Sequence, residues 1–236
     1  MESSNDVLIN KIKVFFKKYP FLFNILYYTF GASFIGKSPQ KAITDLSEDK
    51  IILNLGSGTR IIREHIVNVD FYPFMNVDIV ADIGKLPFAD NSIDAVICES
   101  VLEHVKNPSA IVNEIERVLK PGALVYIIVP FIAGFHSSPN DYYRWSKEGL
   151  RELMKDFKEE EIGIRHGPTS ALLSVLNDWL ATVFSFGIKE IQQVLLVFFT
   201  MVTFPFKIFD YIIYRFKSSE NIAYGFYFIG TKKAKK

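Results

Sequence analysis

The 236-residue sequence has a single cysteine, Cys98, and only two tryptophans. One cysteine excludes an internal disulfide, and the acidic start MESSND lacks the basic segment that opens a secretory signal. The formal net charge of +1 excludes a globally basic nucleic-acid-binding protein. Hydrophobic residues make up 49% and charged residues 22%, which excludes a disordered chain. These absences predict a folded protein of a reducing, cytoplasmic environment.

Long apolar runs are also missing. None reaches the roughly 18 residues expected of a transmembrane helix. The longest, 194–206, has 13 residues and contains Pro205, and extending it to Tyr214 admits Lys207 and Asp210. A peripheral or re-entrant segment fits this stretch better than a clean span, and a distorted span stays open.

Phenylalanine is abundant, and it is concentrated at the two ends of the chain. Of the 22 phenylalanines, 16 lie in residues 1–36 and 184–236. The formal net charge is +2 over residues 1–50, −6 over 51–188 and +5 over 189–236. Basic, aromatic ends favour contact with an anionic membrane surface, because lysine supplies attraction and aromatic rings bury at the interface. The alternative is that these ends only cover a core.

The central part alternates short apolar runs with helical or turn segments, which is typical of a doubly wound parallel sheet. The predicted strands are 51–55, 65–69, 77–80, 95–98, 124–129, 160–164 and 224–230. Helices are predicted at 108–119 and 147–156, and Lys120-Pro121-Gly122 ends the first of them. We expect an α/β fold, a Rossmann-like, doubly wound and mostly parallel seven-stranded sheet, with an N-terminal helical arm and a helical insertion before the last strand.

Four parts are expected along the chain. They are a basic aromatic helical arm at 1–45, a sheet domain at 46–169 plus 222–232, an apolar helical insertion at 170–221 and a basic tail at 233–236. Within the arm, residues 7–30 are predicted to form two helical pieces around Pro20, because an interior proline breaks a helix.

The segment Leu53-Asn54-Leu55-Gly56-Ser57-Gly58-Thr59 ends the first strand and continues past it. Glycines at this edge of an open α/β sheet let the backbone approach a ligand closely, although two glycines alone also fit an ordinary tight turn. Ile61 stands where a dinucleotide-binding motif has its third glycine, which opposes a nicotinamide-dependent oxidoreductase. Asp70, 14 residues after Gly56, ends the second strand, where a carboxylate can accept both hydroxyls of a ribose.

Further motifs follow in order. They are Ala81-Asp82-Ile83, Leu86-Pro87-Phe88, Ser92-Ile93-Asp94-Ala95-Val96-Ile97, Leu102-Glu103-His104-Val105 and Arg117-Val118-Leu119-Lys120-Pro121-Gly122. With this series the sequence resembles the class I S-adenosylmethionine-dependent methyltransferases, particularly the small-molecule, type 11-like branch. The resemblance covers about residues 50–165 and the closing strand. It implies S-adenosylmethionine as cofactor and methyl transfer as activity.

The resemblance also implies which residues contact the cofactor. They are Asn54, Gly56, Ser57, Gly58, Asp70, Asp82, Ile83, Glu99 and Ser100. Gly56 and Gly58 would line the methionine and ribose, and Asp70 would bind the ribose hydroxyls. Asp82, with the residue after it, would bracket the adenine. Glu99, with the residue after it, would border the methionine and the transferring methyl.

Three residues depart from the family pattern. Asn54 stands where an acidic residue is usual, and Ala123 replaces the second glycine of KPGG. Arg60 replaces a frequent glycine and, with the short spacing to Asp70, predicts a truncated first helix. These departures leave an alternative open, a catalytically inactive methyltransferase-fold protein that serves as a membrane-associated interaction module.

Two histidines, His104 and His136, are the candidate general bases, because imidazole has a suitable intrinsic pKa. The loop after the fifth strand supplies the expected acceptor contacts, which are Asp141, Tyr142, Tyr143 and Arg144. The alternative is a structural role, in which Ser146 begins a helix and Arg144 pairs with a carboxylate. No His/Asp cluster has metal-ligand spacing, so no metal is expected.

The apolar segment 170–217 favours a lipid-linked or otherwise apolar acceptor. We expect methyl transfer to a small molecule, sugar, lipid or lipid-linked saccharide, by O-methylation at the cytoplasmic face of a membrane. Peripheral contact would be made through 7–30 and 170–217. Nucleic acid is not an expected partner, because the central part is acidic. A homodimer interface, or a helical cover with the insertion's aromatic residues as its core, stays open.

Overall fold

The computed structural model describes residues 29–136 and 140–234, and the chain divides into two compact units. The sheet unit consists of residues 36–131, 140–165 and 225–236, and the helical unit consists of residues 1–35, 132–139 and 166–224. The helical arm predicted at 7–30 lies almost entirely outside the described residues. The domain boundaries predicted from the sequence stay a prediction.

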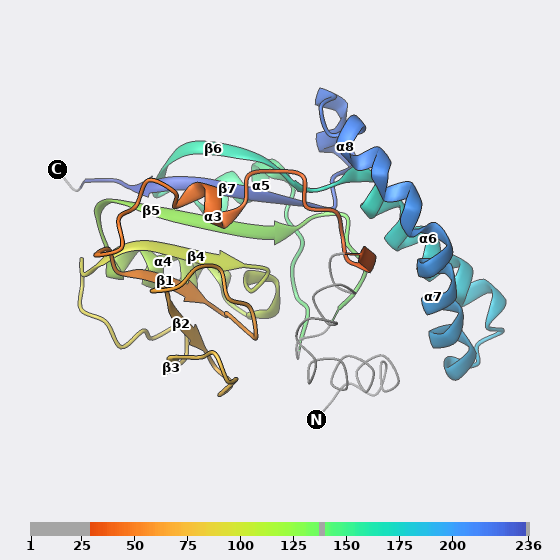
Figure 1. The fold of residues 1–236 in the computed structure, drawn as a ribbon, viewed down its shortest axis with the longest axis horizontal. Helices are drawn as coiled ribbons and strands as arrows, with labels where there is room; N and C mark the ends of the chain where they lie inside the picture. The colour runs from red at the N-terminus through yellow and green to blue at the C-terminus, as the bar shows by residue number, and fades with distance from the viewer. Residues whose placement is uncertain (1–28, 137–139, 235–236) are drawn as a thin grey trace. The chain divides into compact units, whose positions relative to one another are not determined.

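Seven strands form one sheet in the order β3-β2-β1-β4-β5-β7-β6 (Figure 1). The strands are β1 (Ile52–Leu55), β2 (Val67–Asp70), β3 (Ile79–Val80), β4 (Ile93–Glu99), β5 (Leu119–Pro130), β6 (Phe157–His166) and β7 (Gly225–Lys232). The pairs β1–β2, β1–β4, β2–β3 and β4–β5 are parallel, and β7 runs antiparallel to β5. All seven predicted strands are present, so the predicted Rossmann-like fold is confirmed.

Short helices cover the two faces of this sheet. They are α3 (Pro39–Ala42), the 3₁₀ turn η1 (Leu102–His104), α4 (Pro108–Val118) and α5 (Lys147–Leu153). Figure 1 shows α3 on one face and α4 and α5 on the other. Helix α4 begins at Asn107, whose side chain accepts the N–H of Ala110, and it ends before Pro121 as predicted.

The core lies on both faces of the central strands. One buried cluster consists of Ile43, Ile52, Ile62, Ile66, Ala95, Ile97, Tyr126, Ile128, Tyr227 and Ile229. Side chains at the alternate strand positions, such as Leu53, Val96 and Phe228, are buried as well. Because successive strand residues point to opposite faces, this alternation requires cover on both sides of the sheet.

Arg117 ties α4 to the preceding loop. Its guanidinium donates to the carbonyls of Leu86 (3.2 Å) and Phe88 (2.9 Å) and pairs with Glu114 (2.8 Å). These bonds explain why the LPF and RVLKPG motifs occur together, since Arg117 of the second holds the backbone of the first.

The connection between β1 and β2 differs from a regular doubly wound fold. Residues 56–66 contain no helix, which confirms and extends the predicted truncation. Instead, Ile62 and Ile66 of this irregular segment pack into the core cluster with Ile43, which follows α3. The segment around α3 therefore covers the sheet.

Residues 166–224 of the helical unit form a series of helical elements. They are α6 (Pro168–Phe184), α7 (Lys189–Thr203), η2 (Phe204–Phe209), α8 (Asp210–Ile213) and η3 (Lys217–Ile222). Helices α6 and α7 form a hairpin and pack side by side (Figure 1). Its turn contains Phe186 and Gly187, both with positive φ. By length and composition, the helical run Lys189–Ile213 could cross a membrane, and 6% of its apolar window is buried.

The aromatic side chains of the hairpin do not form a core within the described chain. Trp179, Phe184, Phe186, Phe198 and Phe206 are all more than half exposed. These five side chains are therefore not buried in the described part of the chain, whereas Phe199 and Phe204 are half-buried, and the alternative of a helical cover stays open.

Candidate cofactor site

The loop after β1 adopts a conformation that requires its glycines. Gly56 and Gly58 have φ values of +63° and +53°, a region that side chains with a Cβ rarely adopt. The N–H of Gly56 donates to the carbonyl of Val69 at 2.8 Å, which fixes the loop against the end of β2. A Cβ at Gly56 would lie 2.4 Å from the side chain of Val101, so this position has no room for another residue.

Asp70 closes this loop from the neighbouring strand. Its Oδ2 accepts the N–H of Gly58 at 2.8 Å, and its Oδ1 accepts the N–H of Tyr72 at 2.9 Å. Each carboxylate oxygen has a second lone pair for a further donor. Asp70 can therefore hold the glycine loop and accept ribose hydroxyls with the same two oxygens.

The residues present fit S-adenosylmethionine. The Oγ of Ser57 is buried and has no hydrogen-bond partner among the described residues. A buried hydroxyl without a partner is costly, which is consistent with a polar ligand at this loop. The glycine backbone and the Asp70 carboxylate supply the close approach and the acceptor that an adenosyl group needs. Gly56, Ser57, Gly58 and Asp70 are the residues that would hold it, and this role stays a prediction.

Asn54 and Arg60, two of the departures from the family pattern, have specific partners. The amide of Asn54 donates to Oδ1 of Asn68 at 3.0 Å, so an uncharged pair replaces the usual acidic residue. The guanidinium of Arg60 lies 3.2 Å from Oε2 of Glu99, whose side chain is only 6% exposed. Arg60 therefore brings a positive charge to the end of β4, where the methionine part of the cofactor is expected.

The remaining predicted cofactor contacts also lie at this edge of the sheet unit. Ser100 has a φ of +54°, which is strained for serine and directs the chain sharply away from β4. Asp82 follows β3 and accepts the N–H of Gly84 at 2.8 Å, and Ile83 is buried beside it. Their cofactor-binding roles stay predictions.

His104 belongs to the 3₁₀ turn η1 (Leu102–His104), which follows β4 in the sheet unit. Its Nδ1 lies 2.5 Å from the carbonyl oxygen of Asn140. A carbonyl only accepts, so this contact places a proton on Nδ1. Nε2 lies 3.8 Å from Oε1 of Glu103, a fully buried carboxylate.

The four predicted acceptor contacts divide into two pairs. Asp141 and Arg144 bind each other through two short bonds of 2.5 and 2.6 Å, so each already has a partner in the loop. Tyr142 and Tyr143 are about 40% exposed, at 42% and 39%. Ser146 accepts the N–H of Gly149 and begins α5, which confirms the predicted helix start. The acceptor-binding role of all four stays a prediction.

His136 belongs to the helical unit. Its Nδ1 lies 3.0 Å from the carbonyl oxygen of Gly134. The structure therefore brings His104, but not His136, into the same unit as the cofactor loop.

Two features were missed in the sequence. The Arg60–Glu99 pair joins residues 39 apart, and no local pattern marks it. The burial of Glu103 was also not expected. Its position within LEHV, which forms a tight 3₁₀ turn, could have indicated that burial.

Comparison with known proteins agrees with this site. Residues 53–127 match the family described as a methyltransferase domain, and this range contains the glycine loop, Asp70, Asp82 and the end of β4. The chain carries a methyltransferase domain.

Three relatives match parts of this domain. The ubiquinone/menaquinone biosynthesis C-methyltransferase UbiE of Desulfotalea psychrophila is 49% identical over 43 residues, covering 18% of each chain. The sterol 4-C-methyltransferase strm-1 of Caenorhabditis elegans is 32% identical over 77 residues, covering 32% of this chain and 21% of that one. The demethylmenaquinone methyltransferase of Listeria monocytogenes is 31% identical over 111 residues, covering 45% and 43%. The chain thus spans less than half the length of each.

Solved structures show the same fold at low sequence identity. A chain from the Haloferax volcanii complex of the Trm112 methyltransferase activator has a TM-score of 0.54 at 18% identity, with 99% of both chains covered. A SAM-dependent methyltransferase from Methanosarcina mazei has a TM-score of 0.51 at 15% identity, covering 85% of this chain and all of that one. These two likenesses establish the fold of the methyltransferase domain and not its substrate.

Proposed function

We propose that the chain transfers the methyl group of S-adenosylmethionine to a small-molecule, sugar, lipid or lipid-linked acceptor, by O-methylation at the cytoplasmic surface of a membrane. The observation that carries the activity is the glycine loop closed by Asp70, with the hydroxyl of Ser57 buried and bonded to none of the residues that the structure describes. The match of residues 53–127 to a methyltransferase domain supports it.

The chemistry required of the protein is modest. When bound, S-adenosylmethionine supplies an electrophilic methyl group on a sulfonium sulfur. Most of the rate enhancement then comes from holding the acceptor in line, and a hydroxyl acceptor also needs a base. The imidazole of His104 is one candidate for that base, and His136 is the other.

An apolar acceptor is supported by two independent observations. The names of three relatives give quinone and sterol acceptors, which are apolar ring compounds. The helices α6 and α7 carry many exposed apolar side chains, among them Leu172, Val194 and Phe198. Two of these names specify methylation of carbon, whereas we propose methylation of oxygen. Analysis of the methylated product distinguishes the two, because O-methylation gives a methyl ether and C-methylation gives a carbon–carbon bond.

Cofactor binding is tested by calorimetry with S-adenosylhomocysteine. Asp70→Ala should weaken binding at least tenfold, since it removes a charged hydrogen-bond acceptor worth about 1.5–3 kcal/mol. Asp156→Ala, on the same unit but away from the loop, is the matched control and should bind like the wild type. If the wild-type chain binds neither S-adenosylmethionine nor S-adenosylhomocysteine, the inactive interaction module is the better account.

The acceptor is tested with radiolabelled S-adenosylmethionine and a chloroform–methanol extract of membranes. Label in the organic phase supports a lipid or lipid-linked acceptor, and label confined to the aqueous phase argues against it. His136→Ala should abolish transfer while leaving the affinity for S-adenosylhomocysteine near that of the wild type. Retained turnover would remove His136 from the mechanism and leave His104 as the candidate base.

A further inference from the structure

The hairpin of α6 and α7 has an inverted distribution of polar and apolar side chains. The residues buried in the elements from α6 to η3 include Ser170, Asn177, Ser185, Gln193, Asp210 and Ser219. Gln193 is the one buried residue of α7. A surface helix in water has the opposite pattern, with polar residues outward and an apolar stripe inward.

The outward face of the hairpin is apolar over a wide arc. Trp179 of α6 is 59% exposed, and Val194 and Phe198 of α7 are 58% and 54% exposed. At about 100° per residue, the exposed positions of α7 cover an arc of about 140°. An apolar arc of this width fits the acyl chains of a bilayer and also fits a protein partner, and the experiment below distinguishes the two.

Polar side chains join the two helices to each other. The amide nitrogen of Asn177 donates to Oγ1 of Thr203 at 2.9 Å, and Oγ1 of Thr203 lies 3.2 Å from Oδ1 of Asn177. Small and polar residues recur on α6 at Ser170, Asn177, Ala181 and Ser185, which places them on one face. Small residues and interhelical hydrogen bonds are what holds helices together in a bilayer, where apolar contact gives no advantage.

The two charged residues inside the long helical run are satisfied internally. The ammonium of Lys207 donates to the carbonyls of Phe30 and Gly31, both at 2.6 Å. The carboxylate of Asp210 is fully buried and accepts the N–H of Thr169 at 2.6 Å, at the start of α6. Charged groups at membrane depth are found paired with backbone groups in this way.

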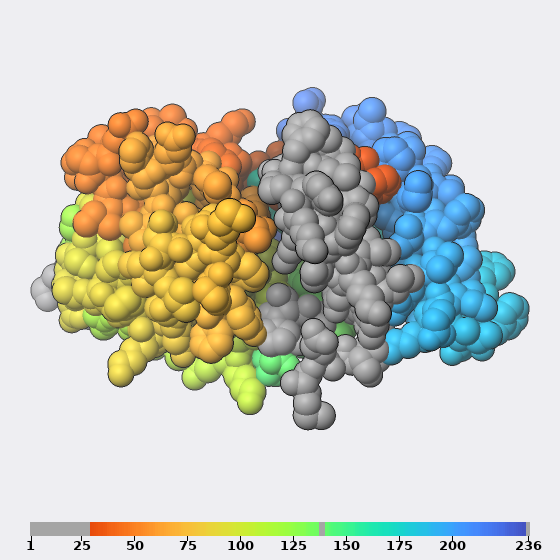
Figure 2. Space-filling model, turned by 60° about the horizontal axis from the view of Figure 1, so that its bottom comes forward, coloured from red at the N-terminus to blue at the C-terminus, as the bar shows by residue number. Residues whose placement is uncertain are grey.

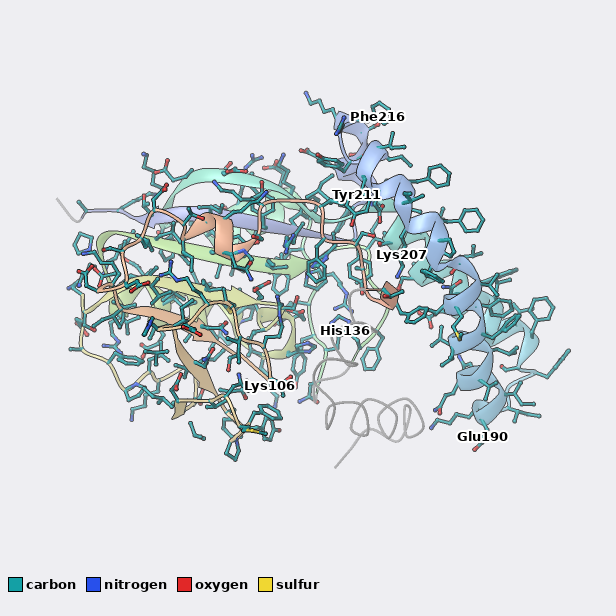
Figure 3. All side chains as sticks on the ribbon, in the orientation of Figure 1. Lys106, His136, Glu190, Lys207, Tyr211 and Phe216 are labelled. Atoms are coloured by element: carbon teal, nitrogen blue, oxygen red, sulfur yellow. The ribbon has the colours of Figure 1, made fainter. Side chains whose placement is uncertain are left out.

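The other two charged residues of the run, Lys189 and Glu190, lie at its start. Between Glu190 and Lys207 the chain has no charged residue over 16 positions, about 24 Å of helix. The hydrocarbon core of a bilayer is about 30 Å thick. Figure 3 shows Glu190 at one end of the run and Tyr211 and Phe216 toward the other, and the helices from α6 to α8 form one continuous surface in Figure 2.

We infer that the α6–α7 hairpin is inserted into the hydrocarbon region of a lipid bilayer, with the face that contains Trp179, Val194 and Phe198 against the acyl chains. This inference deepens the membrane contact of the proposed function and rests on it. Insertion differs from surface contact, because Asn177, Gln193 and Thr203 then lie in the helix interface, and the ring of Phe198 lies below the headgroups.

The two tryptophans provide a direct test on the full chain. Trp179 is exposed on the hairpin, and Trp145 is 8% exposed in the sheet unit. Phosphatidylcholine–phosphatidylglycerol vesicles are prepared with bromine either near the headgroup or near the middle of the acyl chain. The difference between wild type and Trp179→Phe isolates the fluorescence of Trp179, even if Trp145→Phe does not fold.

We expect mid-chain bromine to quench Trp179 more strongly than shallow bromine, and the protein to stay with the vesicles in alkaline carbonate. Stronger quenching by shallow bromine, or release by carbonate, would overturn insertion in favour of surface contact. No quenching, with self-association that rises with concentration, would overturn it in favour of an interface between two copies. Quenching is measured without cofactor and so does not depend on methyl transfer. Strong quenching by mid-chain bromine in a protein that transfers no methyl group would refute the proposed activity and leave insertion supported.

A double variant tests whether the face that contains Val194 and Phe198 contacts the lipid. Val194→Glu with Phe198→Glu should abolish carbonate-resistant binding, because a charge in hydrocarbon is costly. Met75→Glu is the control, since Met75 is fully exposed on the sheet unit and should bind vesicles like the wild type. Retained binding by the double variant would contradict the assignment of this face.

Discussion

The sheet unit and the helical unit distribute their side chains in opposite ways. In the sheet unit, Ile97 and Phe228 are buried at 0% and 1% exposure. In the helical unit, Phe198 is 54% exposed, while Asn177 and Gln193 are buried at 4% and 7%. The first pattern is that of a domain folded in water, and the second is that of helices packed in lipid. The difference indicates that the sheet unit serves cofactor binding and that the helical unit serves the membrane contact inferred above.

The largest expected effect compares the same substitution in both units. Phe228→Ala removes a buried ring and should cost about 3–5 kcal/mol of unfolding free energy. Phe198→Ala removes a half-exposed ring and should cost less than about 1 kcal/mol in detergent. Denaturant unfolding of both variants checks this, and equal losses would contradict the contrast between the units.

The next effect compares two glycines. A Cβ at Gly167 would lie 2.0 Å from the Cγ of Asp210, so Gly167→Ala should displace the carboxylate that caps α6. Breaking a buried, hydrogen-bonded charge costs about 3–5 kcal/mol, of which local relaxation recovers part. Gly58→Ala meets no atom within 4 Å and should cost only the backbone penalty of about 1–2 kcal/mol. Thermal melts that rank them in the reverse order would refute the proposed role of Asp210 as the cap.

A smaller effect concerns the polar contact between α6 and α7. Asn177→Ala removes its hydrogen bonds to Thr203 and should cost about 1–2 kcal/mol. Asn177→Leu should not restore the stability, because an apolar residue leaves the Thr203 hydroxyl with one partner fewer. Full recovery in Asn177→Leu, measured by unfolding in detergent, would indicate an ordinary apolar helix interface.

The smallest effect is a pH dependence of the sheet unit. Hydrogen bonds from Arg117, together with the N–H of Leu86, hold the pKa of Glu114 below its usual value despite partial burial. The folded pKa is below the unfolded one, so this stabilisation is present above about pH 4.5 and is lost as the pH falls through the folded pKa.

Glu114→Gln should therefore flatten the fall in stability between about pH 5 and pH 3, by less than about 1 kcal/mol. Glu148→Gln, whose side chain is 77% exposed, is the control and should follow the wild-type curve. Identical slopes for wild type and Glu114→Gln in urea unfolding would show that this ion pair is not linked to folding.

Much of the sheet unit could be predicted because its signals are local. Strand runs such as 124–129 and the Pro121-Gly122 stop follow from burial and backbone geometry, and they lie within β5 and after α4 as expected. Asp70 and the glycine loop are adjacent in the structure because neighbouring parallel strands end at one edge.

The remaining features depend on contacts that no local pattern marks. Arg60 meets Glu99 only through the path of an irregular loop, and the cap at Gly167 comes from Asp210, 43 residues later. The buried polar face of the hairpin could have been predicted from the spacing of Ser170, Asn177 and Ser185. Composition and the length of apolar runs do not detect this spacing.

The most direct test measures affinity for S-adenosylhomocysteine and vesicle flotation on the same protein preparations. The account predicts that Asp70→Ala floats with vesicles but binds S-adenosylhomocysteine at least tenfold more weakly, since one charged acceptor is lost. Val194→Glu with Phe198→Glu should bind S-adenosylhomocysteine like the wild type and should not float. Loss of both properties in either folded variant would contradict the separation of cofactor chemistry from membrane insertion.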